Sequence, residues 1–317
     1  MLIGVARMEN NERYLYTMLA VVVSFWGLNV VLVKYLTALP PLYVSSIRMT
    51  LAAVCFLPIL ILYRKRMRLA KADWLLIAGV GASSIALHQI TMAIGVEYTT
   101  AGNGSLILSL NPLVTSLLAM LFLGEAMSWR KAMGIVIGFS GVLIVVLSRH
   151  GSVQLQGLGD VLMFFSMLMY VTGGLLIRKL VLRGVPVLLV TALAQVFGAV
   201  FLCSAALIDQ PASYYGAIEI SGTQWIAIFV SVVFSSALGT LGWNYGIRQL
   251  GASRTAVFLN GMPLASLFFA ALLLGEPLKL VHLLALIMIV TGVYLGTKQL
   301  PQNSPAASLG SDTTTKA

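Results

Sequence analysis

The sequence predicts an all-α membrane protein in which ten transmembrane helices form two inverted repeats of five. Three observations support this fold class. Hydrophobic residues make up 59% of the 317 residues and charged residues only 9%, which is more apolar surface than a water-soluble core of this length can bury. The apolar residues gather in runs of about 20, the length that crosses a bilayer as a helix. One segment also occurs twice, at residues 101–125 and 252–276.

Ten apolar runs are long enough to span a membrane. They lack the alternating segments of roughly ten residues that mark transmembrane strands, so we expect helices. The expected spans cover residues 15–36, 41–63, 74–95, 99–124, 130–148, 158–180, 186–208, 224–246, 253–275 and 279–298. The first run has no small-residue cleavage site and nine more runs follow it, which favours a retained helix over a signal peptide.

The duplicated segment divides the chain into two repeats. Its copies read AGNGSLILSLNPLVTSLLAMLFLGE and ASRTAVFLNGMPLASLFFAALLLGE, at a constant offset of 151 residues. The first repeat covers residues 14–149 and the second residues 157–298. A short N-terminal segment, residues 1–13, precedes them, and a polar tail, residues 299–317, follows and is expected to be disordered. Because each repeat has five spans, an odd number, the second must be inverted relative to the first.

Positive charge orients these helices. Sixteen of the twenty Lys and Arg residues fall on the side of both termini. The four exceptions are Lys34, Arg48, Arg149 and Lys279. Cytoplasmic loops carry such an excess, so both termini should be cytoplasmic. The basic loop 64–71 corresponds to the loop 209–223, which has no Lys or Arg, as inversion requires.

Several motifs together resemble one transporter family. In the second repeat they are Asn244-Tyr245-Gly246, Leu250 to Ser253, Pro263-Leu264 and Leu274 to Pro277. The first repeat carries Trp26-Gly27, Lys34, Arg48, Pro112-Leu113 and Leu123-Gly124-Glu125. This pattern is similar to that of the drug/metabolite transporter superfamily, specifically its EamA-like ten-helix bacterial group. The resemblance implies secondary transport through a central cavity, in a bacterial inner membrane. The smallest relatives couple transport to protons through a Glu in the first span, which here has no acid.

Inverted repeats are typical of carriers that expose a midplane site to either side in turn. We therefore expect a secondary active transporter that exports small metabolites such as amino acids. A passive facilitator, uniporter or channel for small polar solutes is the alternative. No HExxH, GxSxG or P-loop motif occurs, so no enzyme, cofactor or metal site is expected.

The expected partners are a small-molecule substrate and the lipid bilayer. The net charge of +10 lies mostly beside the cytoplasmic face, where anionic lipid attracts it. Nucleic-acid binding requires a soluble basic surface, which the sequence lacks. The oligomeric state stays open, a monomer included.

Polar and aromatic residues inside the spans are the candidate substrate-binding set, because such groups are costly in a bilayer unless they face protein or water. The candidates are Trp26, Asn29, His88, Gln89, Asn103, Asn111, Tyr170, Trp243, Asn244 and Asn260. His88 is also the candidate for proton coupling, since histidine changes charge near neutral pH. Packing between helices is the alternative role for each of them.

Pro112 and Pro263 fall in the middle of their expected spans. A proline there removes a backbone donor and kinks the helix, so the pair is predicted to form matched hinges. Arg48 lies about two turns into the second span. It is a possible charge partner for a carboxylate, a helix C-terminus or an anionic group of the substrate.

Two further features recur in both repeats. GxxxG pairs at 134–138 and 292–296 let helices approach closely, either within one chain or between subunits. Glu125 and Glu276 each follow Gly at the end of a span. They are expected to cap the next helix or to pair with a nearby cation such as Arg130.

A reporter fused after Lys298 tests the predicted orientation. We expect a reporter that is active only in the cytoplasm to be active there, because positive charge is retained on that side. A reporter that is active only outside the cytoplasm should stay silent at this position, and its activity would contradict the topology.

Overall fold

The computed structural model describes residues 2–36, 38–63, 69–98, 107–108, 110–150, 157–274 and 280–297. In these residues the regular structure is entirely helical, which confirms the predicted all-α class. Seven segments are long and apolar enough to cross a membrane: Glu12–Val33, Pro41–Tyr63, Lys71–Gly95, Leu158–Leu182, Val187–Asp209, Gly222–Leu250 and Ala252–Leu273. Asn111–Leu123 and Leu284–Gly296 are shorter apolar helices. The chain is a multi-pass membrane protein; ten spans and an inverted second half stay predictions.

The first half of the chain contains one long helix followed by shorter pieces. Its helices are α1 (Leu2–Tyr35), α2 (Pro41–Cys55), α3 (Leu57–Tyr63), α4 (Lys71–Val80), α5 (His88–Glu97), α7 (Asn111–Leu123) and α8 (Trp129–His150). A π-helical segment, η2 (Gly81–Leu87), joins α4 to α5 in one continuous span. The helix α2 begins at a proline, a position where no helical partner for the backbone N–H is needed.

The second half follows a similar order. It contains α9 (Leu158–Leu182), α10 (Val187–Asp209), α11 (Ala212–Gly216), α12 (Gly222–Val230), α13 (Thr240–Leu250), α14 (Ala252–Ala256), α15 (Met262–Leu274) and α16 (Leu280–Thr297). A π-helical segment, η3 (Ser231–Gly239), joins α12 to α13, and a 3₁₀ turn, η4 (Val257–Gly261), joins α14 to α15. The start of α12 carries a capping box formed by Ser221 and Gln224.

The local structure of the two halves matches at the offset of 151 residues. Shifting α7 by this offset gives residues 262–274, the bounds of α15. The same shift takes η2 to residues 232–238, inside η3. Segments with π-helical hydrogen bonding are rare and occur frequently at functional sites. Both halves therefore carry the same irregularity in the same span.

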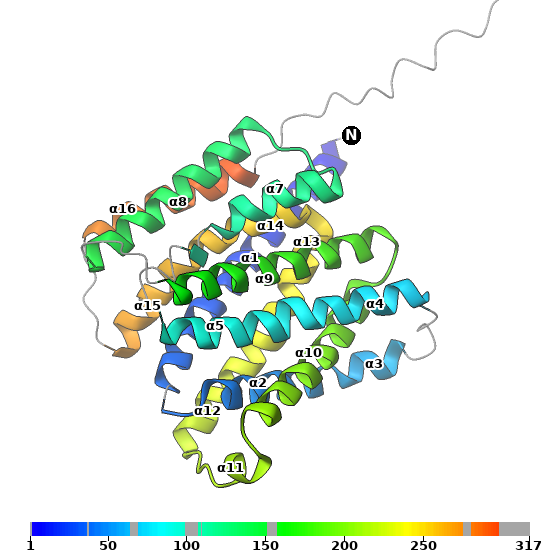
Figure 1. The fold of residues 1–317 in the computed structure, drawn as a ribbon. Helices are drawn as coiled ribbons and strands as arrows, with labels where there is room; N and C mark the ends of the chain where they lie inside the picture. The colour runs from blue at the N-terminus through cyan, green and yellow to red at the C-terminus, as the bar shows by residue number, and fades with distance from the viewer. Residues whose placement is uncertain are drawn as a thin grey trace, which may run out of the picture.

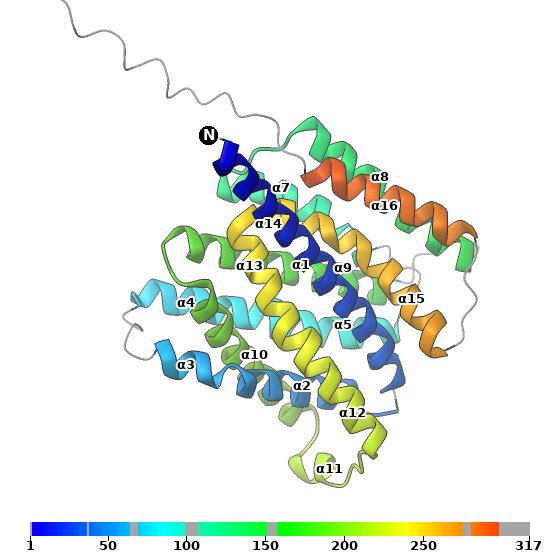
Figure 2. The same cartoon turned by 180° about the vertical axis from the view of Figure 1, so that it is seen from behind.

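The two GxxxG pairs pack against each other within the chain. The helices α8 and α16 run side by side at one edge of the molecule (Figures 1 and 2). A Cβ atom added to Gly134 would lie 2.5 Å from the carbonyl oxygen of Gly292, and one added to Gly292 would lie 2.5 Å from that of Gly134. Any side chain at this crossing would force the helices apart. Of the two alternatives for these glycines, the structure shows the contact within one chain.

The largest cluster of buried apolar side chains joins the two halves. It includes Leu19 of α1, Ile77 of α4, Leu180 of α9, Leu189 of α10 and Ile247 of α13. Large apolar side chains elsewhere are exposed, which suits a surface that faces lipid rather than water. The packed centre thus holds α1, α9 and α13 in fixed positions, and these helices carry most of the site described below.

The two candidate hinge prolines lie at the starts of helices. Pro112 is the second residue of α7 and Pro263 the second residue of α15. In its first turn a helix needs no partner for the backbone N–H, so proline is tolerated there. Pro112 thus lies near the start of the described helix α7, whereas Pro263 lies within the continuous apolar span Ala252–Leu273. In the second half the irregular backbone lies just before Pro263, in the 3₁₀ turn η4. Hinge motion at these prolines stays a prediction.

Candidate functional site

Four ring side chains from both halves meet in the packed centre. The ring centroids of Trp26 on α1 and Trp243 on α13 lie 4.9 Å apart. Tyr170 on α9 meets Trp26 edge to face, with centroids 6.2 Å apart. Its ring centroid also lies 5.1 Å from that of His88 on α5. These four residues were all candidates from the sequence, and the structure places them in one cluster, here called the aromatic cluster.

The aromatic cluster is tied to the π-helical segment η3. The indole Nε1 of Trp26 donates a hydrogen bond of 3.2 Å to the backbone carbonyl oxygen of Ser235. One turn later in α1 and one turn earlier in η3, the hydroxyl of Ser231 donates a hydrogen bond to Oδ1 of Asn29. Two successive turns of α1 are thus fixed against η3, which orients Trp26 and Asn29 together.

Arg48 contacts the same amide oxygen. Its Nη2 donates a hydrogen bond of 3.0 Å to Oδ1 of Asn29, and its side chain is only 4% exposed. Its Nε has no hydrogen-bond partner. No carboxylate of the described residues pairs with this guanidinium. A cation inside a membrane protein is therefore held by a single neutral oxygen, one turn from Trp26.

A narrow crevice adjoins the aromatic cluster. The cavity inside it has a volume of about 10 Å³. It is lined by Asn111 and Thr115 of α7, Tyr170, Val171 and Gly174 of α9, Trp243 and Ile247 of α13, and Ala252 and Ala256 of α14. The hydroxyl of Thr115 donates a hydrogen bond of 3.0 Å to Oδ1 of Asn111. The free space suffices for a water molecule rather than for a metabolite.

The contacts of His88 define its tautomer. Its Nδ1 lies 3.1 Å from the backbone carbonyl oxygen of Ser166 and 2.8 Å from the hydroxyl of the same residue. That hydroxyl donates to the backbone carbonyl of His88, at 3.0 Å, so its oxygen is free to accept. Because both neighbours of Nδ1 then act as acceptors, the proton of the neutral ring belongs on Nδ1. Nε2 is left as the nitrogen that can accept a proton.

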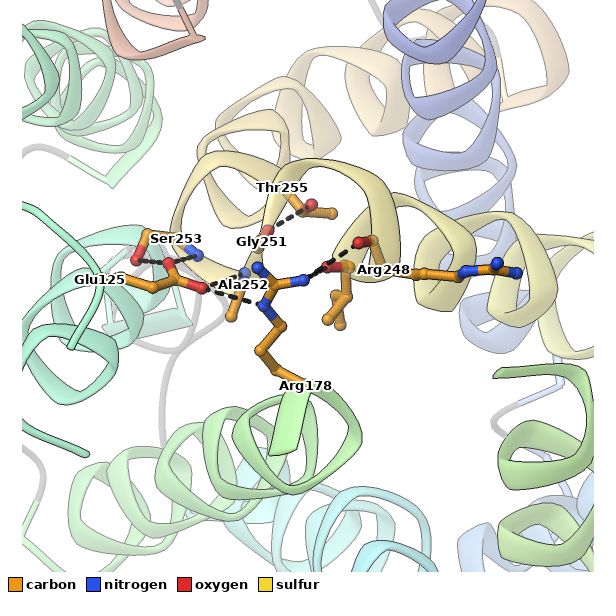
Figure 3. Close-up of polar contacts among 8 residues, drawn as sticks. Glu125, Arg178, Arg248, Gly251, Ala252, Ser253 and Thr255 are labelled. Atoms are coloured by element: carbon orange, nitrogen blue, oxygen red, sulfur yellow. Dashed lines mark hydrogen bonds and ion pairs between the residues drawn. The ribbon is translucent and has the colours of Figure 1, made fainter. Parts of the chain in front are cut away.

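Glu125 forms a polar network at one end of the crevice, here called the Glu125 clasp (Figure 3). Its Oε1 accepts a hydrogen bond of 3.1 Å from the backbone N–H of Ala252. Its Oε2 accepts from the backbone N–H of Ser253 at 3.2 Å and from the hydroxyl of Ser253 at 2.7 Å. The carboxylate thus caps the start of α14, where backbone N–H groups lack helical partners. Glu125 thus caps α14 and not α8, the next helix in the chain, for which the sequence predicted a cap.

Arg178 completes the clasp from α9. Its Nε lies 3.4 Å from Oε1 of Glu125. Its Nη1 donates to the backbone carbonyl oxygens of Ile247, at 3.3 Å, and Arg248, at 3.0 Å, at the end of α13. Gly251, with φ +88°, turns the chain between α13 and α14, and a Cβ atom there would lie 2.8 Å from Oε1 of Glu125. One ion pair therefore joins α7, α9, α13 and α14.

The other candidates from the sequence lie outside this arrangement. Nδ2 of Asn244 donates a hydrogen bond of 2.9 Å to Oγ1 of Thr191 on α10. Asn260 is fully buried and its amide lies against Gly138 of α8. Gln89 is half-buried beside His88 in the chain. Asn103 lies outside the described residues. Among the described residues no group of His, Cys, Asp or Glu side chains could hold a metal ion.

Several residues of the site were missed from the sequence. Thr115 lies four residues after Asn111, and Ser166 four residues before Tyr170, so each shares a helix face with a candidate. That spacing was a usable signal. Arg178 gave no such signal, because its role depends on which helices are neighbours in space.

Comparison with known proteins gives consistent matches over nearly the whole chain. The profile of the EamA-like transporter family matches twice, at residues 14–147 and 157–297. Two relatives named uncharacterized transporters, YyaM of Bacillus subtilis and a protein of Archaeoglobus fulgidus, are each 30% identical to this chain. The matches cover 88% of this chain in both cases, and 92% and 97% of the relatives. These proteins are transporters rather than enzymes.

Two further matches concern the fold and one specific relative. A solved structure titled "Crystal structure of protein" aligns with a TM-score of 0.77 at 15% identity, over 90% of this chain and 96% of that one, which supports the fold alone. A protein of Streptantibioticus cattleyicolor named "Probable terminal-alkyne amino-acid exporter" is 28% identical over 66% of this chain and 69% of its own length.

Replacing Glu125 by Gln tests the Glu125 clasp. The amide keeps the shape of the side chain but loses its charge, and one of its two terminal groups can no longer accept hydrogen bonds. The side chains of Arg178 and Glu125 are only 21% and 17% exposed. We expect a loss of stability of about 1–3 kcal/mol, measured as a lower melting temperature of the purified protein in detergent.

Glu12→Gln is the matched control. Glu12 lies 3.8 Å from Arg254, and its side chain is 48% exposed. An exposed pair contributes about 0–1 kcal/mol, so this variant should melt close to the unchanged protein. Equal melting temperatures for the two variants would show that the clasp contributes no more than a surface contact.

Proposed function

We propose that this chain, which belongs to the EamA-like transporter family, is a secondary active transporter that works by alternating access between two inverted halves. The protein is a membrane transporter of small molecules. In the proposal, small metabolites such as amino acids are exported from the cytoplasm through a central polar and aromatic site. The alternative from the sequence, a passive facilitator or channel, is addressed by the first experiment below.

The crevice between the halves is the observation that carries this proposal. Its lining combines α7 of the first half with α9, α13 and α14 of the second. Two of its lining residues, Ile247 and Ala252, are bonded directly to the Glu125 clasp. Since the free space fits only a water molecule, a metabolite can enter only when these helices separate. A site that opens by rearrangement of two halves is the requirement of alternating access.

The position of the Glu125 clasp indicates to which side of the membrane the described conformation is closed. With both termini in the cytoplasm, the predicted topology puts the ends of α7, α9 and α13 on the cytoplasmic side. The Arg183–Asp73 and Arg254–Glu12 ion pairs lie at that same end of their helices. The described conformation is therefore proposed to be closed towards the cytoplasm, so export requires the clasp to break before substrate enters.

The duplication supports two halves of similar structure. The family profile matches each half, and both halves carry a π-helical segment at the same place. Domain limits at 14–149 and 157–298 are proposed on this basis. We propose Pro112 and Pro263 as the hinge positions, because Pro112 lies at the start of α7 and Pro263 directly follows the 3₁₀ turn η4, where the helical hydrogen-bond pattern changes.

The aromatic cluster suggests the class of substrate. Trp26, Tyr170 and Trp243 offer large apolar faces, and Asn111 with Thr115 offers a polar edge beside them. Such a site suits a small amphipathic metabolite. One relative is named a probable amino-acid exporter. For this chain we propose amino acids or related compounds as substrates.

Counterflow in proteoliposomes tests the proposed mechanism. Vesicles loaded with an unlabelled amino acid are diluted into the same labelled amino acid, over a panel that includes L-leucine, L-phenylalanine and L-methionine. A carrier should show saturable, transient accumulation of label. Non-saturable flux without counterflow would favour a channel. Tyr170→Ala should reduce counterflow at least about tenfold through loss of the ring, whereas Phe122→Ala, at a 73% exposed position, should not.

Proton coupling is proposed for His88 and has its own test. In the described contacts Tyr170 is the other titratable side chain against the His88 ring. His88→Gln keeps a hydrogen-bonding side chain but cannot titrate, so it should retain counterflow and lose accumulation driven by a pH gradient. Ser166→Ala is the control, because it removes a hydrogen bond of His88 while keeping the ring. Undiminished pH-driven accumulation in the His88 variant would show that His88 only packs.

A further inference from the structure

Arg48 is a buried cation of the membrane interior that has no ion-pair partner among the described residues. Its side chain is 4% exposed, yet its only hydrogen bond in the described structure is to the neutral amide oxygen of Asn29. Its Nε has none. A buried cation without an anionic partner is strongly unfavourable, and intramembrane charges usually mark a site of function. Arg178, at the end of α9, shows the contrast, since it is paired with Glu125.

The position of Arg48 connects it to the proposed substrate site. Asn29 follows Trp26 by three residues on α1, and Ser231 precedes Ser235 by four residues on η3. The Asn29–Ser231 and Trp26–Ser235 hydrogen bonds therefore lie on successive turns of one helix contact. Through Asn29, Arg48 is thus linked to the same contact between α1 and η3 that orients Trp26, one turn of α1 away.

From this geometry we infer that Arg48 is the anchor for a carboxylate group of the transported metabolite. This inference rests on the proposed function and names the chemistry its substrate must carry. A guanidinium binds a carboxylate through two parallel N–H groups. On Arg48, Nε has no partner and Nη2 is held by an amide that an anion can displace. These two atoms form one edge of the guanidinium and match the two oxygens of a carboxylate.

The charge of the site selects a monoanion. The single guanidinium of Arg48 neutralises one negative charge, so a dianionic phosphate would bring a second negative charge into the membrane interior that Arg48 cannot balance. A carboxylate leaves no net charge. The rest of the metabolite then lies against Trp26, Trp243 and Tyr170, which favours an apolar side chain, and an ammonium group can interact with these ring faces. The substrate class is a small carboxylate with an apolar side chain.

Matched probes that differ only in the carboxylate test the inference. The pairs are L-leucine and L-leucinamide, and hexanoate and hexanamide, assayed as competitors of counterflow in proteoliposomes of the full chain. The unchanged protein should prefer each acid over its amide by at least about tenfold, the value of a charge-assisted hydrogen-bonded pair. In Arg48→Gln the preference for the acid should fall to about twofold or less, because the two parallel N–H groups of the guanidinium are lost. Arg183→Gln, which removes a guanidinium at an exposed site, should keep the preference.

Asn29→Asp keeps the inference testable if Arg48→Gln does not fold. This substitution places a carboxylate where the amide oxygen now contacts Arg48, so it should raise the melting temperature and abolish the preference for acids. If Arg48 were only structural, Asn29→Asp would leave that preference unchanged, and this result would overturn the inference.

The outcomes separate this inference from the proposed function. Saturable counterflow with equal inhibition by acids and amides would overturn the role of Arg48 and leave the carrier intact. Flux without any counterflow would contradict the proposed function itself. A preference for acids that is lost in both Arg48→Gln and Asn29→Asp, and kept in Arg183→Gln, supports the inference.

Discussion

The pairing of Glu125 with Arg178 is the interaction on which the centre of the structure depends. Between α13 and α14 the chain turns at Gly251, leaving carbonyl groups at the end of one helix and N–H groups at the start of the next without helical partners. Unpaired backbone groups are costly where water is scarce. Glu125 accepts from the N–H groups, Arg178 donates to the carbonyls, and the two side chains neutralise each other. A turn that would otherwise be unfavourable is thereby stabilised by Glu125, just after α7, and by Arg178 of α9.

The same four helices that meet at this ion pair also line the crevice. The lining residues Ile247 and Ala252 are bonded to the clasp, and Gly174 precedes Arg178 by one turn on α9. Any motion that widens the crevice by separating α7 from α14 must therefore stretch the contacts of Glu125. In the proposed mechanism, closing the site and closing this end of the protein are therefore a single event. This coupling is what an alternating-access carrier requires, because a site open at both ends would leak.

The sequence was sufficient for the fold class and for part of the site. A run of about 20 apolar residues crosses a bilayer as a helix, because only a helix pairs all of its own backbone polar groups there. The helical, multi-pass character could therefore be predicted directly from the sequence. Depth along a span could also be read, which is why Trp26, His88, Tyr170 and Trp243 were selected as candidates. The direction in which a side chain points could not, because helices that are apolar all round give no face. Asn244 bonds to Thr191 and Asn260 lies against Gly138, away from the aromatic cluster. The start of α7 at Asn111 was also missed, although the following Pro112 is a residue that the first turn of a helix tolerates.

Two arginines within the helices differ in their ion pairing, and this difference separates a structural charge from one that can bind a substrate. Arg178 has its charge balanced by Glu125 and its donors used by two carbonyls, so removing it would leave a carboxylate and several backbone groups unsatisfied. Arg48 is more deeply buried, but its one hydrogen bond in the described structure is to Asn29, whose Oδ1 also accepts from Ser231. A protein optimised for stability alone would gain from an apolar residue or an acid at this place. The cost of leaving Arg48 unpaired makes sense when a substrate supplies the missing negative charge, because the site then binds more strongly an anion that fits than a neutral analogue of the same shape.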